Sequence, residues 1–107
     1  MTQYNKLIRD KIPEIMSAKS VGYKTHTLSE SEFKLALLHK LIEEATEALE
    51  ASNDTHSLTA ELADVLEVVD TIITSQNLSK TDIEKVKADK YLSHGGFEKR
   101  IFLESTN

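Results

Sequence analysis

The hydrophobic and polar positions along the chain predict helices over most of its length. Apolar residues recur at helical spacing over about 29–51 and again over about 55–76, and a polar, turn-like stretch at 52–57 separates the two segments. Two long helices with a short connection form an antiparallel hairpin, so the fold is expected to be mainly α. The apolar stripe of the later helix consists of Leu58, Leu62, Val65, Val69 and Ile72.

Capping patterns predict where the helices begin. Ser29-x-x-Glu32 is a capping box, in which the serine and glutamate side chains each satisfy a free backbone N–H at the helix start. A shorter helix is expected earlier in the chain, over about 10–19. Pro13 fits its first turn, where the missing N–H of proline costs little.

The C-terminal third predicts one more helix and a possible strand. Ser79-x-x-Asp82 repeats the cap pattern, and a helix is expected from there to about residue 91, before the glycine pair at 95–96. The segments 23–28 and 97–103 both alternate between apolar and polar residues. Each is compatible with a short strand, and together they would form a short terminal β pair.

Chain length and composition predict one domain that self-associates. A chain of 107 residues suits a single domain over residues 1–107. A domain of this size buries only about two-thirds of its unfolded surface. The apolar surface of a two-helix hairpin is best closed by a second hairpin, so a four-helix core is expected on forming a homodimer or higher homo-oligomer.

Charge and hydropathy exclude several classes of function. The net charge of −5 argues against nucleic-acid binding, because phosphate backbones favour surplus lysine and arginine. No apolar run approaches the ~20 residues of a membrane span, so no membrane partner is expected. The absence of cysteine excludes disulfides and thiolate metal sites. The N-terminal residues lack a signal-peptide core, and the expected location is the cytoplasm.

Acidic residues form two groups on the expected hairpin. Glu43, Glu44 and Glu47 form a narrow stripe beside the apolar face of the first long helix, and Glu61 and Asp64 flank the apolar stripe of the second. Both groups therefore border the packed seam, where like charges repel and burial disfavours ionisation. A divalent cation would relieve both effects, and oxygen-only ligands suit Mg²⁺ or Mn²⁺. The alternative is a solvated face, because glutamate is a good helix former.

Three motifs carry a resemblance to a known family. The acidic groups stand as EEATE at 43–47 and ELAD at 61–64, and the flanking motifs are YNKLIRDKIPEIM at 4–16 and GGFEKRIFL at 95–103. Together they resemble the MazG-type all-α nucleoside triphosphate pyrophosphohydrolases. The terminal motifs are similar to those of a small single-domain branch, the predicted house-cleaning pyrophosphatases, which relate to phosphoribosyl-ATP pyrophosphohydrolases.

The resemblance implies an activity and a metal. It implies a homo-oligomeric enzyme that uses Mg²⁺ to cleave nucleoside triphosphates between the α and β phosphates, giving a nucleoside monophosphate and pyrophosphate. It implies that Glu43, Glu44, Glu47 and Asp64 bind metal, and that Glu61 either binds metal or orients water. It leaves open which glutamate acts as the base, so Glu43 and Glu61 are both catalytic candidates.

Basic residues are candidates for holding the phosphates. Lys40, one turn before the first acids, is a third catalytic candidate, which either reaches a phosphate or pairs with Glu44. If the chain termini fold over the hairpin, five further cations would clamp the leaving pyrophosphate; otherwise they are ordinary surface charge. These five are Lys6, Arg9, Lys11, Lys99 and Arg100.

Two alternatives remain at the level of sequence. The first is a related pyrophosphohydrolase that acts on another compound, such as phosphoribosyl-ATP. The second is a non-catalytic helical dimer that acts as a binding or regulatory module. Turnover of a panel of substrates distinguishes the first alternative from the main hypothesis. The second alternative predicts that partner binding and stability survive replacement of the acids.

Overall fold

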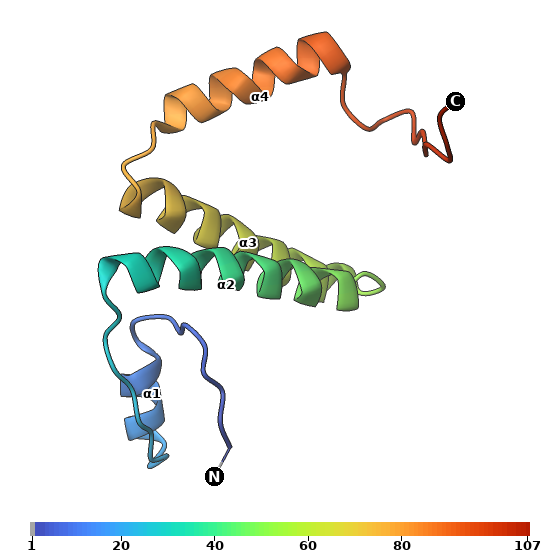
Figure 1. Ribbon diagram of the computed structural model, residues 1–107. Helices are drawn as coiled ribbons and strands as arrows, with labels where there is room; N and C mark the ends of the chain where they lie inside the picture. The colour runs from blue at the N-terminus through green and yellow to red at the C-terminus, as the bar shows by residue number, and fades with distance from the viewer. Residues whose placement is uncertain (1) are drawn as a thin grey trace. The chain divides into compact units, whose positions relative to one another are not determined.

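A computed structural model describes residues 2–107, and the elements within them are helices only (Figure 1). The prediction of a mainly α fold is therefore confirmed. The described residues divide into two compact units, the first ending at Asn77 and the second comprising residues 78–107. The first unit holds three helices and the second holds one: α1 (Ile12–Ala18), α2 (Glu30–Glu50), α3 (Thr55–Ser75) and α4 (Lys80–His94). None of these helices combines the length and apolar character needed to cross a membrane.

The predicted capping box at the start of α2 is present. The Ser29 hydroxyl accepts a hydrogen bond from the Glu32 backbone N–H at 3.3 Å, and the Glu32 carboxylate accepts one from the Ser29 backbone N–H at 2.9 Å. The Ser29 backbone N–H, and to a smaller extent the Ser29 side chain, hold the pKa of Glu32 below its ordinary value. The box fixes where α2 begins and hence which of its residues face α3.

The start of α3 is capped by Asp54. Its carboxylate accepts hydrogen bonds from the His56 backbone N–H at 3.1 Å and from the Ser57 hydroxyl at 2.7 Å. The bonds from Ser57 and His56 hold the pKa of Asp54 below its ordinary value. Four residues separate α2 from α3, and a connection this short is typical of an antiparallel helical hairpin.

Helices α2 and α3 lie side by side as the predicted antiparallel hairpin (Figure 1). Their seam buries Leu37 and Val68, which are 3% and 8% exposed. Glu44 lies in the same seam and is 6% exposed. Few side chains are buried this deeply, so the hairpin has a small core and one of its buried members is a carboxylate.

The ends of α1 and α4 follow the predicted chemistry. Pro13 lies in the first turn of α1. The Ser79 hydroxyl accepts a hydrogen bond from the Asp82 backbone N–H at 3.1 Å at the start of α4. Gly95, with a φ of 81°, ends α4, which runs three residues beyond the predicted end near Tyr91. Glycine suits this position because other residues rarely adopt a positive φ.

The predicted terminal β pair is not confirmed, because neither segment is a strand in the structure. Residues 23–28 have no ladder partner within the first unit. In the second unit, the Arg100 backbone N–H donates to the Phe97 carbonyl at 3.1 Å, and Arg100 has a φ of 57°. A turn with a left-handed residue interrupts the extended backbone that a strand requires.

We expect Ser29→Ala to lower the free energy of unfolding by about 1 kcal/mol, because the Glu32 N–H loses its acceptor. Urea denaturation followed by circular dichroism measures the change. Ser52→Ala, in the exposed turn after α2, is the matched control and should cost less. Equal losses in the two variants would show that the cap contributes nothing specific.

Candidate active site

Five carboxylates from the two helices of the hairpin gather on one side of their seam. Glu43, Glu44 and Glu47 of α2 form one group, and Glu44 with Glu61 and Asp64 of α3 forms a second. Within each group, one carboxylate oxygen per residue lies within 4.8 Å of the others. Glu44 belongs to both groups and joins them. The structure therefore brings together all five acids that the sequence nominated as metal ligands.

The helical repeat explains how these acids meet. Side chains three or four residues apart share a face of a helix, which applies to Glu43 and Glu47 on α2 and to Glu61 and Asp64 on α3. Glu44 is one position further round α2 and is therefore turned toward α3. This position explains why Glu44 is buried whereas the other four acids are only partly covered.

Two buried carboxylate oxygens in this group have no hydrogen-bond partner within residues 2–107. They are Oε2 of Glu44 and Oε2 of Glu61. A buried acceptor without a partner costs about 1–3 kcal/mol, and more when it is charged. Carboxylate oxygens are the donors that hard divalent cations prefer. The two acidic groups therefore fit a divalent cation, which would give both oxygens a partner.

Burial raises the pKa of the Glu44 carboxyl above its ordinary value of 4.5. Glu47 raises this pKa further, through a hydrogen bond and through its like charge, and Lys40 opposes the shift. The Lys40 ammonium is 3.4 Å from Glu44 Oε1, but it leaves the other oxygen without a partner. Desolvation therefore outweighs this single ion pair.

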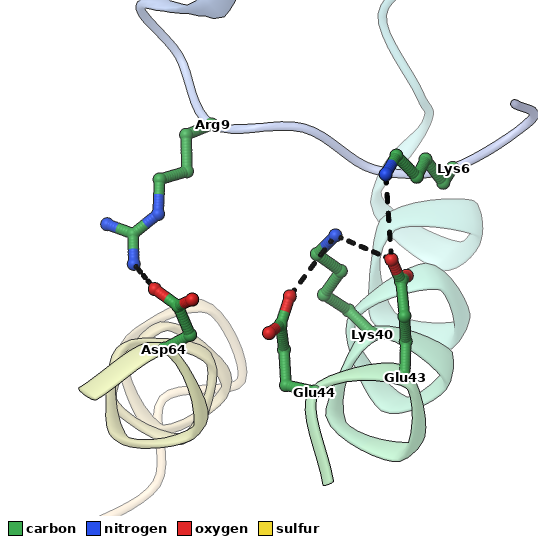
Figure 2. A network of polar contacts seen from close by, with 6 residues as sticks. All are labelled: Lys6, Arg9, Lys40, Glu43, Glu44 and Asp64. Atoms are coloured by element: carbon green, nitrogen blue, oxygen red, sulfur yellow. Dashed lines mark hydrogen bonds and ion pairs between the residues drawn. The ribbon is translucent and has the colours of Figure 1, made fainter. Parts of the chain in front are cut away.

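Three cations face the acids, and two of them come from the N-terminal segment (Figure 2). Lys40 lies 3.2 Å from Glu43 Oε1, and Lys6 lies 3.8 Å from the same oxygen. Arg9 donates to Asp64 Oδ1 at 2.7 Å, a distance typical of a charge-assisted hydrogen bond. The N-terminal segment thus folds over the hairpin and places two cations at the acidic groups.

Three of the predicted phosphate contacts are not among these cations. Lys11 is exposed at the start of α1, and within the described residues it forms no ion pair with the acids. Lys99 and Arg100 belong to the second unit, in the irregular segment after α4. The first unit therefore assembles a site with Lys6, Arg9 and Lys40 alone.

The fold and the site define an all-α protein whose helical hairpin holds two carboxylate groups suited to a metal ion, with three cations beside them. The model of the MazG nucleotide pyrophosphohydrolase domain matches residues 33–92, more than half of the chain. The chain belongs to this family and is an enzyme that hydrolyses phosphoric anhydride bonds of nucleotides. The matched residues include Lys40 and all five acids. Searches among curated proteins and among solved structures gave no match.

Sequence patterns did not identify two features of the site. Helical spacing nominated the acids but not the two oxygens that lack a partner, because burial of single atoms depends on how the helices pack. The patterns also missed a cleft beside the acids that Asn5 and His39 help to line. An isolated asparagine and an isolated histidine carry no spacing that could have indicated it.

The raised pKa of Glu44 gives a testable pH dependence of stability. A carboxyl whose pKa is higher in the folded than in the unfolded protein stabilises the fold fully at pH values below about 4.5, its ordinary pKa. This stabilisation is lost as the pH rises through the folded-state pKa. We therefore expect metal-free Glu44→Gln to unfold at a higher temperature than the wild type at pH 7. The difference should shrink as the pH falls through the folded-state pKa toward 4.5.

Thermal unfolding with a chelator, from pH 4 to pH 8, measures this difference. Glu67→Gln, on an exposed part of α3, is the matched control and should follow the wild type at every pH. A Glu44→Gln protein less stable than the wild type at pH 7 would contradict the assignment, because the charge would then stabilise the fold.

Proposed function

We propose that this enzyme cleaves a nucleoside triphosphate between its α and β phosphates, releasing a nucleoside monophosphate and pyrophosphate. We further propose that it uses Mg²⁺, or Mn²⁺ in its place. The observation that supports the proposal best is the pair of buried, unpartnered oxygens of Glu44 and Glu61 among five carboxylates. Surface acids on a solvated helix would have no reason to be buried in this way.

The proposed ligands are Glu43, Glu44, Glu47, Glu61 and Asp64. A divalent cation bound by these acids would neutralise phosphate charge and acidify a water molecule. Hydrolysis of a phosphoanhydride then needs that water to be held in line with the bond and a base to take its proton. No nucleophilic side chain of the protein is required.

Glu61 is our first candidate for the base. Lys40 and Lys6 lie 3.2 Å and 3.8 Å from Glu43 Oε1, so this carboxylate is already engaged with cations, which supports a ligand role. Glu61 forms no ion pair within the described residues, so as the base it would take a proton from water in place of binding the cation through Oε2. Glu43 is the alternative base, and the corresponding glutamine variants distinguish the two.

Lys6, Arg9 and Lys40 are the proposed phosphate contacts. Each already faces a carboxylate of the site, so each lies where a phosphate bridged to those carboxylates would bind. The Arg9 guanidinium has further N–H groups beyond the one that meets Asp64, and it can grip a phosphate with two bonds. Lys11, Lys99 and Arg100 remain further candidates.

We also propose that the enzyme acts as a homodimer or a higher homo-oligomer. Leu38, Ile42 and Leu49 form an exposed stripe on α2 and are 42%, 65% and 74% exposed. On α3, Leu62 and Leu66 are 48% and 63% exposed. Exposed apolar side chains that gather on one surface often mark an association surface, and a second hairpin would close these two stripes into a four-helix core.

Product analysis tests the proposed reaction. Purified enzyme with a panel of nucleoside triphosphates should give monophosphate and pyrophosphate when Mg²⁺ or Mn²⁺ is present and should give neither with a chelator. Loss of the base costs about 10²–10⁴-fold in rate, so we expect that range for Glu61→Gln and a smaller loss for an exposed control, Glu67→Gln. The substrate panel should include phosphoribosyl-ATP.

Other results of this assay would change the proposal. Release of orthophosphate in place of pyrophosphate would contradict cleavage between the α and β phosphates. Preferential turnover of phosphoribosyl-ATP would move the substrate to that compound and leave the chemistry unchanged. A larger loss in Glu43→Gln than in Glu61→Gln, with metal binding retained, would reassign the base.

The oligomer is tested by solution mass. The wild type should have at least twice the chain mass of 12.0 kDa by light scattering, and Leu66→Asp should lower it, because a carboxylate in an apolar interface loses its hydration. Asp70→Lys, an exposed change of charge on α3, should leave the mass unchanged. A wild-type mass of one chain would contradict the oligomer.

A further inference from the structure

A cleft adjoins the acidic groups on the side of the N-terminal segment. Its volume is about 340 Å³, which lies at the lower end of the range for small-molecule pockets. Lys40 and Glu43 line this cleft and also belong to the network of charges at the acids (Figure 2). A molecule bound to the acids by one end would therefore have its other end at the cleft.

Most of the cleft wall is apolar. Leu7 and Leu28 line it from segments that precede α2, and Leu35 and Ala36 line it from α2 itself. Apolar walls exclude water from a flat, weakly polar ring but offer nothing to a phosphate. The cleft thus suits the base and sugar of a nucleotide, whereas the acids and cations suit its phosphates.

Two polar residues give the cleft a means of discrimination. The Asn5 carboxamide offers both donors and an acceptor, which is the combination that matches the edge of a nucleobase. The His39 imidazole offers a ring face on which a base can stack. Asn5 has a φ of 48°, a left-handed conformation that asparagine tolerates better than most residues.

We propose that this cleft binds the nucleoside of the substrate and that Asn5 determines which base is preferred. This inference rests on the proposed function, because it needs the phosphates of the same molecule to lie at the acidic groups. The base and sugar lie against Leu35 and Ala36, and the Asn5 carboxamide hydrogen-bonds the edge of the base. The N-terminal segment then contributes to both halves of the site, because Lys6 and Arg9 contact the phosphates and Asn5 contacts the base.

The test compares two ligands that share phosphates but differ in the nucleoside. One is a nucleoside triphosphate with a methylene group between the α and β phosphates, and the other is inorganic tripolyphosphate. Calorimetry with Mg²⁺ gives a Kd for each on the full chain. Ala36→Phe, which fills the cleft, should raise the Kd of the nucleotide analogue at least about tenfold. It should change the Kd of tripolyphosphate less than about twofold.

Two variants act as checks on Ala36→Phe. Asn5→Gly removes the carboxamide but accepts the left-handed backbone without strain, so it should reduce the differences in Kd among analogues of the four bases. Lys34 lines a separate cleft of about 530 Å³ together with Phe33 and residues 75–77, so Lys34→Ala should affect neither ligand. Circular dichroism confirms that each variant is folded.

The outcomes separate this inference from the proposed function. In one outcome, the wild type binds both ligands while Ala36→Phe and Asn5→Gly bind the nucleotide analogue with the wild-type Kd. This result would overturn the cleft assignment alone. Equal weakening of both ligands in Ala36→Phe would overturn it too, because the cleft would then hold phosphate. Wild type that binds neither ligand would overturn the proposed function and this inference together.

Discussion

The burial of a carboxylate in the seam of a two-helix hairpin is the constraint on which the rest of this structure depends. Glu44 is almost fully covered, lies among like charges and has an oxygen without a partner. Such an arrangement is unfavourable for an isolated hairpin, because desolvation and repulsion both oppose ionisation. It is favourable only when positive charge is supplied nearby. The protein supplies part of that charge itself, through Lys40, Lys6 and Arg9.

This balance of charge explains the position of the N-terminal segment. Residues 6–9 have no helix or strand to hold them against the hairpin, and ion pairs with Glu43 and Asp64 attach them there. Exposed pairs of this kind contribute little stability, about 0–1 kcal/mol each. They are therefore weak enough to be exchanged for contacts with a bound phosphate. The same segment lines one side of the cleft beside the acids, so its position connects the charged and apolar halves of the proposed site.

Different faces of α2 carry different tasks. One face packs on α3 through Leu37 and Glu44, the next carries Glu43 and Glu47, and a third carries the exposed apolar stripe. The hydrophobic core is small because only one of these faces is used for packing within the chain. A hairpin built in this way places its functional groups close to its uncovered apolar surface, which is why the proposed association and the proposed site are expected to influence one another.

The sequence by itself determined the helices, their caps and the choice of acids, because these follow from local spacing along the chain. Ser29 and Glu32 form their box within one helical turn, and Glu61 and Asp64 share a face by the helical repeat alone. Only the tertiary structure decided that Glu44 joins the two acidic groups, that Arg9 meets Asp64 and that Asn5 lines a cleft. These relations depend on how separate segments pack, and neither periodicity nor composition encodes the distance between residues far apart in the chain.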